Sequence, residues 1–149
     1  MATTRKRTHI GKFNDIVDQL FDICEKYEHP EVQSSIQYYR YQIDLGRKAN
    51  PRLVVETIVN PLAPFIDHIM TRDAAFFLSV DIHAVNSDTK EQTILDSLRD
   101  SWRHVDDEHT KDKIWKLLQL ALMYGVLVTR DPVQLAAVNK HRVTPLVLD

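Results

Sequence analysis

The chain contains few of the residues on which small stapled domains and glycine-rich catalytic loops depend. It has one cysteine and three glycines among 149 residues. The single Cys24 excludes an intramolecular disulfide and a zinc site made of several cysteines, so we expect a reducing compartment. The glycines are too widely separated for a dinucleotide fingerprint or a phosphate-binding loop, and no Gly-x-Ser-x-Gly motif is present. These absences argue against the nucleotide-binding and hydrolase classes that use such loops.

Long apolar runs and a strong charge of one sign are also absent. No apolar run approaches the ~20 residues that span a bilayer, and the basic N-terminus lacks the apolar segment of a secretory signal. We therefore predict no membrane span and a protein that is not secreted. The formal net charge of −2 and the isoelectric point of about 6.4 argue against a general surface for nucleic acid or other polyanions.

Apolar residues recur at offsets of three and four along most of the chain, which is typical of amphipathic helices. The pattern predicts an all-α protein: a single compact bundle of about six or seven helices with flexible ends. A chain of this length can bury enough apolar surface in one core to fold without a bound metal or a disulfide. We predict a basic N-terminal arm at 1–9, a helical domain at 10–140 and a C-terminal tail at 141–149.

Polar residues that precede a proline or an apolar stripe mark where helices begin. Asn50 and Asp131 each stand before a proline, which places a capping side chain ahead of a proline at the first helical position. Asp73 is predicted to cap a short helix in the same way. These positions divide the middle and the end of the chain into separate helices.

Glycine and proline are expected to mark where helices end. Gly46 and Gly125 follow apolar stripes, so we expect both to stand just after a helix in the left-handed conformation. Asn60-Pro61 interrupts the pattern between residues 53 and 70, and we predict two helices joined at that point.

Cysteine and tryptophan are assigned to the core rather than to a reactive site. Cys24 falls on an apolar stripe with no cation fixed beside it in the sequence, which favours inert packing over a reactive thiol. Trp102 shares a helical face with Leu98 and is predicted to be buried. Trp115 lies at the edge of its stripe, so it is either a second core residue or an exposed contact residue.

Four aromatic and aliphatic blocks stand out along the chain. They are Asn-Pro-Leu-Ala-Pro-Phe-Ile-Asp-His-Ile at 60–69, Arg-Asp-Ala-Ala-Phe-Phe at 72–77, Ser101-Trp102, and Lys-Ile-Trp-Lys-Leu-Leu-Gln-Leu at 113–120. Through these blocks residues 13–125 resemble a family of small helical proteins encoded by nucleocytoplasmic large DNA viruses. The resemblance implies a viral accessory or virion role, in the virion or the host cytoplasm, and it transfers no catalytic residue.

The segment from His104 to His109 is the candidate metal site. It brings two imidazoles and three carboxylates together, and Asp81 with His83 could add ligands. The competing interpretation is helix capping, because carboxylates such as Asp107 satisfy the free N–H groups at a helix start. Paired ligands on successive helical turns are missing, so capping is favoured and no metal or other cofactor is predicted.

Two tyrosines form a candidate partner-binding surface with the arginine between them. Tyr38 and Tyr41 flank Arg40 on a helix whose apolar face includes Tyr39, so both point partly outward. Tyr and Arg are enriched at binding hot spots. Protein contact is favoured over base stacking because no basic field surrounds these residues.

The two ends of the chain provide the other candidate contacts. A cluster of positive charge near the N-terminus consists of Arg5, Lys6 and Arg7. It is a phosphate-contacting arm, a short nuclear address, a peptide that docks into an acidic groove of a partner, or simply a solvated terminus. The tail carries an apolar patch that we expect to order on a partner, outside the folded body. The patch consists of Val143, Leu146, Val147 and Leu148.

These features favour a non-enzymatic viral structural or accessory protein that acts through protein–protein interaction, as a virion component or as an assembly or host-interaction factor. The expected partners are other protein subunits, copies of the chain itself among them. The alternative is a nucleic-acid-associated viral factor that uses the basic arm, and the third hypothesis is a metal-dependent enzyme that uses residues 104–109. Salt dependence separates the first two, because phosphate contacts weaken steeply as salt rises.

Overall fold

Helices make up nearly all of the regular structure in the computed structural model, which describes residues 8–27, 30–79, 98–99 and 101–148. No strand occurs among these residues, and the all-α fold class is confirmed. In chain order the elements are α1 (His9–Tyr27), α2 (Pro30–Ala49), α3 (Pro51–Leu62), the 3₁₀ turn η2 (Ala63–Phe65), α4 (Ile66–Met70), α5 (Ala74–Ser79), α8 (Glu108–Thr129) and α9 (Pro132–Asn139).

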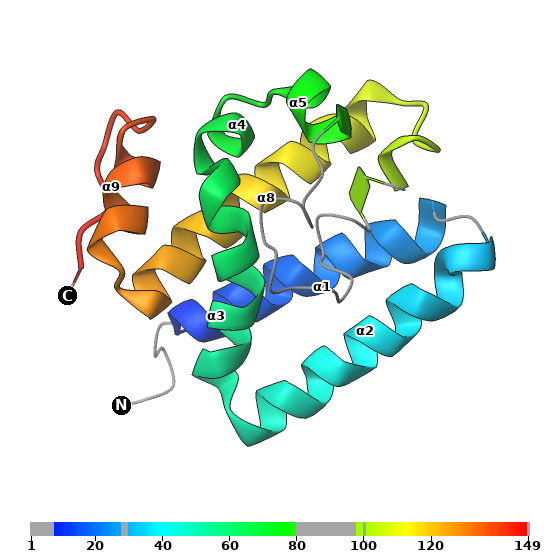
Figure 1. Cartoon of the computed structure of the whole chain (residues 1–149), viewed down its shortest axis with the longest axis horizontal. Coiled ribbons are helices and arrows are strands. Elements are labelled where there is room, and N and C mark those ends of the chain that lie inside the picture. Colours follow the sequence, from blue (N-terminus) through cyan, green and yellow to red (C-terminus); the bar gives the residue numbers. More distant parts are fainter. Residues whose placement is uncertain (1–7, 28–29, 80–97, 100, 149) are drawn as a thin grey trace, which may run out of the picture.

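Helices α1 and α8 form the centre of the molecule. They pack along each other, and α8 also contacts α3, α4 and α9. Helix α2 packs on α1 and α3 and leaves its remaining face on the outside, as Figure 1 shows. This arrangement makes α2 an outer helix that two other helices hold in place.

The buried side chains form one core to which every long helix contributes. The largest fully buried side chains are Phe13, Leu20, Phe21, Ile36, Ile58, Leu62, Leu98, Ile114, Leu118 and Leu122. Cys24 is buried as predicted. Trp102 and Trp115 are both buried, with ring centroids 5.4 Å apart in an edge-to-face contact, so Trp115 is a core residue.

The capping predictions are confirmed at the described helix starts. The side chain of Asn50 accepts the backbone N–H of Leu53 at 3.2 Å at the start of α3. Asp131 accepts two backbone N–H groups at the start of α9. Asp107 and Asp73 accept backbone N–H groups of α8 and α5 in the same way. These short polar side chains therefore set where the core helices begin.

The prediction that Gly46 and Gly125 end helices is wrong. Both lie inside helices, and no described glycine has a positive φ. A Cβ atom on Gly125 would lie 2.3 Å from Val59 Cγ2, and one on Gly46 would lie 2.7 Å from Val54 Cγ2. Both glycines therefore serve close approach of two helices, and Arg130 (φ 60°) occupies the left-handed position after α8.

The predicted break at Asn60-Pro61 lies a few residues further along the chain. Helix α3 continues through Pro61 to Leu62, and the non-helical backbone is at Phe65 (φ −112°, ψ 12°). Pro61 lacks the N–H that would bond the backbone oxygen of Thr57, so the helix loses one hydrogen bond in the turn before the break. Leu62 is buried in the core, which holds this last turn in place.

Residues 51–70 are the one stretch of the described chain that is long and apolar enough to cross a membrane by length and composition. The prediction that the chain has no membrane span stays a prediction. About 44% of the window is buried inside the structure. Ile58 and Ile66 are among the side chains that this stretch places in the core. A core helix passes the same test, so the stretch is weak evidence for a membrane span.

Residues 141–148 pack against the helices rather than forming a separate tail. His141 Nε2 lies 2.6 Å from Asp67 Oδ1 on α4. Asn139 holds the backbone of Leu146 through two hydrogen bonds, of 2.7 and 3.0 Å, and the Leu146 side chain packs against the core. The prediction of a tail outside the folded body is therefore corrected, because local hydrogen bonds fix this segment.

Candidate interaction surface

An exposed apolar stripe runs along the outer face of α2. The exposed fractions are 63% for Tyr38, 58% for Tyr41 and 48% for Leu45. Tyr39, one residue from Tyr38, packs on the core and meets the ring of Phe21 edge to face. The outward orientation predicted for the two tyrosines is therefore confirmed, while their role as a binding surface stays a prediction.

A groove between α2 and α3 adjoins this stripe. Its volume is about 320 Å³, and it is lined by Tyr39, Gln42, Ile43, Gly46, Ala49, Asn50, Leu53, Val54 and Thr57. Leu53 is 54% exposed at the start of α3. The absence of a side chain on Gly46 lets Val54 approach α2 closely. The groove and the stripe together offer apolar surface on two adjacent helices.

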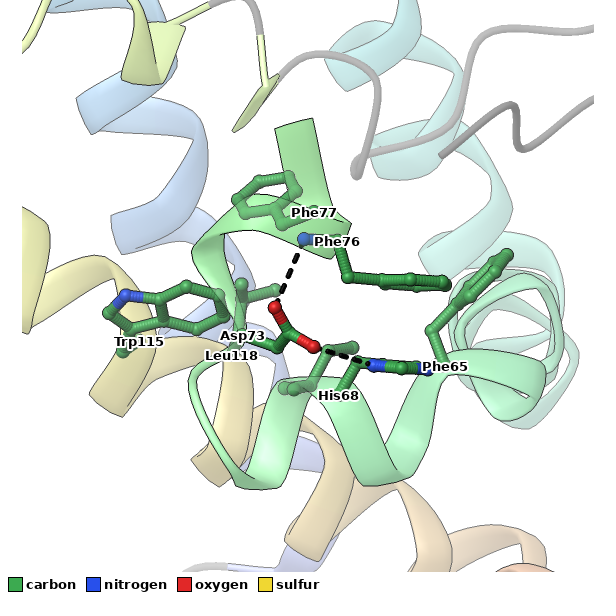
Figure 2. A pocket seen from close by; sticks show the side chains of 8 residues that line it. Phe65, His68, Asp73, Phe76, Phe77, Trp115 and Leu118 are labelled. Carbon is green, nitrogen blue, oxygen red and sulfur yellow. Dashed lines mark hydrogen bonds and ion pairs between the residues drawn. The ribbon is translucent and has the colours of Figure 1, made fainter. Parts of the chain in front are cut away.

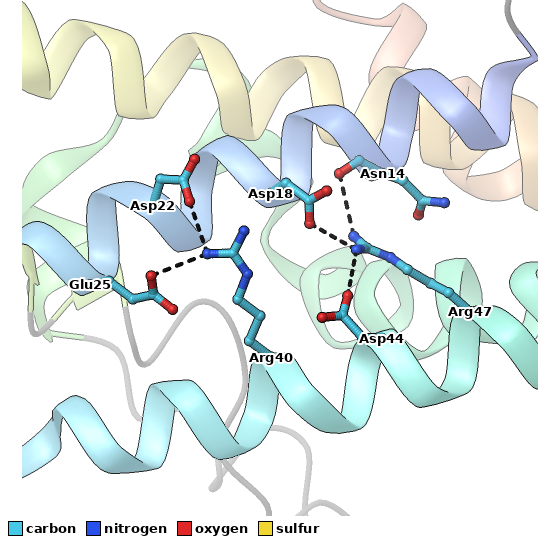
Figure 3. Close-up of polar contacts among 7 residues, drawn as sticks. All are labelled: Asn14, Asp18, Asp22, Glu25, Arg40, Asp44 and Arg47. Carbon is cyan, nitrogen blue, oxygen red and sulfur yellow. Dashed lines mark hydrogen bonds and ion pairs between the residues drawn. The ribbon is translucent and has the colours of Figure 1, made fainter.

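Arg40 does not share a face with the exposed tyrosines. Its guanidinium group binds Asp22 at 2.9 Å and Glu25 at 3.2 Å on α1, and it lies over the ring of Phe21. Figure 3 shows this contact between the two helices. Burial lowers the pKa of Arg40, but the bond to Asp22 and the nearby carboxylates outweigh that effect and raise it. Arg40 therefore joins α1 to α2.

A second arginine strengthens the same junction two turns further along α2. Arg47 Nη1 binds Asp18 on α1 at 2.8 Å and Asp44 on α2 at 3.0 Å. Its Nη2 atom donates to the backbone oxygen of Asn14 at 3.3 Å. Since both arginines face α1, the polar contacts hold α2 with its aromatic stripe turned outward.

The apolar patch predicted near the C-terminus is divided by the structure. Val143 and Val147 are exposed, but Leu146 packs against the core and Leu148 is half-buried. The four residues therefore do not form one continuous surface, because the bonds from Asn139 turn Leu146 inward.

A histidine–carboxylate pair borders a small cavity between α4, α5 and α8. His68 Nδ1 lies 3.1 Å from Asp73 Oδ2, and Asp73 also accepts the N–H of Phe76 at 3.0 Å. Figure 2 shows the His68 ring stacked on Phe76, with centroids 3.5 Å apart. The bond from Phe76, followed by that from His68, lowers the pKa of Asp73.

At this cavity the pair of His68 and Asp73 has a structural role. Its volume is about 10 Å³, which leaves room for at most one water molecule. Apart from His68 and Asp73 its lining is apolar: Phe65, Ile69, Phe76, Phe77, Trp115 and Leu118. The lining set brings no hydroxyl or thiol to the imidazole, so the pair can orient α5 but has no nucleophile to activate.

The predicted metal and phosphate sites are only partly covered by the structure. Asp107 caps α8 through the N–H and hydroxyl groups of Thr110, at 2.8 and 2.6 Å. The described residues contain no group of three or more His, Cys, Asp or Glu side chains that could hold a metal. The proposed ligands Asp81 and His83, together with the basic arm at 5–7, lie outside the described residues.

Leu45 and Leu53 also belong to the exposed apolar surface, although neither is predicted from the sequence as a contact residue. Leu45 stands four residues after Tyr41, so helical spacing alone could have placed it beside the tyrosines. The prediction that Gly46 ends the helix obscures this spacing, because Leu45 then stands at the last position before the helix end. Leu53 joins the surface only through the packing of α3 on α2, which no local pattern encodes.

Comparison with protein-family models, curated proteins and solved structures found no match to this chain.

Proposed function

We propose that this chain is a protein–protein interaction module, and that the outer face of α2 with the adjoining groove is its binding surface. The observation that carries the proposal is the exposed stripe of Tyr38, Tyr41 and Leu45. Single exposed apolar residues are normal, but a row on one helix face beside an apolar groove is typical of contact sites. The partner is a protein subunit.

The way α2 is held supports this function. Arg40 and Arg47 bind carboxylates of α1, so the stripe is presented on an element that is fixed before any partner arrives. A fixed surface loses little conformational entropy on binding, which favours affinity. Tyrosine supplies a large contact area with few rotatable bonds, and its hydroxyl can stay hydrated at the rim of an interface.

The biological setting that we propose is viral. It rests on the resemblance of residues 13–125 to small helical proteins of nucleocytoplasmic large DNA viruses, and it implies a virion component or an assembly or host-interaction factor without enzymatic activity. The interaction surface is compatible with each of these roles, because all of them act through contact with another protein subunit.

Site-specific photo-crosslinking tests the binding surface. A photo-reactive amino acid replaces Tyr41 in the chain expressed in cells, and the control carries it at Glu108, whose side chain is 92% exposed on α8. We expect a discrete protein adduct from position 41 and none from position 108. Adding Tyr38→Glu to the first protein should abolish the adduct, since it places a charge in the apolar stripe.

Equal labelling from both positions, or no adduct from position 41, would contradict the proposed surface. Thermal unfolding of each variant is measured alongside, because Tyr38 is exposed and its replacement should leave the fold intact. A variant that keeps its melting temperature and loses the adduct separates loss of binding from loss of folding.

A further inference from the structure

The exposed stripe on α2 has the spacing of a helix that packs against another helix. Tyr38, Tyr41 and Leu45 follow one another at offsets of three and four, as the apolar positions of a coiled-coil seam do. We propose that a second copy of this chain covers the stripe, with the two α2 helices packed antiparallel around Tyr41. This inference rests on the proposed function and names its partner.

The exposed apolar area is sufficient for such a dimer. Two tyrosines exposed by 63% and 58% present about 200–300 Å² between them. Leu45 and Leu53, each exposed by about half, add about 100 Å². Two copies would therefore bury about 600–800 Å² of apolar surface. Since interfaces are about 56–65% apolar, the total is about 1,000–1,300 Å².

That area indicates a reversible dimer rather than an obligate one. It reaches the ~1,000 Å² that separates specific interfaces from weak contacts, and it stays below the ~2,000 Å² at which obligate dimers begin. The α1–α2 contacts and the single core also form within one copy. The folded monomer is therefore expected to persist when the chain is dilute.

The position of Lys48 favours the antiparallel arrangement. Lys48 stands three residues after Leu45, so it is the next position of the same seam, and it is exposed. Parallel helices would bring the Lys48 side chains of the two copies together in the seam, where like charges repel. Antiparallel packing separates them and places Tyr38 of one copy against Leu45 of the other.

Symmetry explains why the assembly would stop at two copies. A two-fold axis near Tyr41 presents the same stripe from both sides, so one contact covers both stripes completely. The tyrosine hydroxyl groups can reach solvent at the edge of the seam, so no polar atom needs to be buried without a partner. An amphipathic helix of a different protein is the rival occupant, and the experiment distinguishes the two.

Sedimentation velocity of the purified chain, residues 1–149, over a wide concentration range tests the dimer. We expect a monomer–dimer equilibrium, and Tyr41→Glu should raise its dissociation constant by about 30-fold or more, the effect of removing a hot spot and adding repulsion. The matched control is Val133→Glu on α9, because Val133 is also an exposed apolar residue, 77% exposed, and the charge change is the same. The control should leave the equilibrium unchanged.

A chain that remains monomeric at every concentration would overturn the second copy as the partner. Equal weakening by Tyr41→Glu and Val133→Glu would also overturn it, since the dimer would then not depend on the α2 stripe. The photo-crosslinking result is independent: a monomer that still forms an adduct through position 41 retains the proposed function and assigns the surface to a different protein. Loss of that adduct refutes the proposed function itself.

Discussion

At the scale of single residues, close contact between α3 and α8 depends on the missing side chain of Gly125. The position lies inside α8, where glycine has a lower helix propensity than alanine by roughly 1 kcal/mol. Its presence is explained by packing, because a Cβ there would lie 2.3 Å from Val59 Cγ2 and 3.2 Å from Phe13 Cε2. Both neighbours are fully buried. The core around Gly125 therefore has no room for a methyl group at that position.

We predict that Gly125→Ala destabilises the fold by about 1–3 kcal/mol, because an added methyl group forces buried side chains apart. Urea unfolding followed by circular dichroism measures the effect. The control is Gly11→Ala in the first turn of α1, which should be neutral or slightly stabilising through helix propensity. If Gly125→Ala is as stable as the original chain, the close approach of α3 and α8 is incorrect.

At the scale of secondary-structure elements, short polar side chains decide where helices begin and how the last segment is held. Asp107 starts α8 and accepts one backbone N–H, and Asp131 starts α9 and accepts two; these groups would otherwise lack a partner. Asn139, the last residue of α9, acts on the following segment instead, since it binds both backbone groups of Leu146. The boundaries of the last two helices are therefore fixed by local hydrogen bonds.

Replacement of the cap of α8 should distinguish hydrogen bonding from metal binding at residues 104–109. Asp107→Ala should lower the melting temperature, because the N–H and hydroxyl of Thr110 lose their acceptor. Asp107→Asn should retain most of the stability, since asparagine caps a helix about as well as aspartate. Thermal unfolding with and without a chelator provides the measurement. Stoichiometric metal that is lost with Asp107→Asn would contradict the capping role.

Deletion of residues 141–149 should destabilise the folded domain. The loss of Leu146 burial and of its two hydrogen bonds to Asn139 is expected to cost about 1–3 kcal/mol, and the contact of His141 with Asp67 is lost as well. Differential scanning calorimetry measures the change. Val143→Ser is the control and should have no effect, because Val143 is fully exposed. An unchanged melting temperature after the deletion would show that this segment is not part of the fold.

At the scale of the whole molecule, one apolar core holds the helices together, and polar contacts of aspartate side chains connect separate elements at the surface. Arg72 binds Asp112, which connects the turn after α4 to α8. His141 binds Asp67, which connects the C-terminal segment to α4. These contacts lie at the surface, where each contributes little to the free energy of unfolding. They share one pH dependence, because each involves an aspartate.

We predict that stability falls as the pH drops below about 4. Hydrogen bonds lower the pKa of four aspartates in the folded state, namely Asp67 (from His141), Asp73 (from Phe76 and His68), Asp107 (from Thr110) and Asp112 (from Arg72 and Lys116). The unfolded chain therefore binds more protons in this range. The stability that these groups contribute is present above the unfolded pKa and is lost as the pH falls through the folded pKa.

Melting temperatures between neutral pH and pH 3 or so measure this dependence. The variant Asp67→Asn with Asp73→Asn should be less stable at neutral pH and should lose less stability on acidification, since two of the titrating groups are gone. An identical loss in the variant and the original chain would show that other groups control acid unfolding.

The sequence by itself determined the helices, their starts and most of the core, because helical periodicity and capping depend on neighbours within about one turn. Cys24, Trp102 and the cap at Asp107 could be assigned in this way, as could the outward direction of Tyr38 and Tyr41. Only the tertiary structure decided which helices approach closely at Gly125, where Arg40 finds its partners, and that Leu53 of α3 lines the groove beside the α2 stripe. The physical reason is that these features arise between residues far apart in the chain, so no local pattern records them.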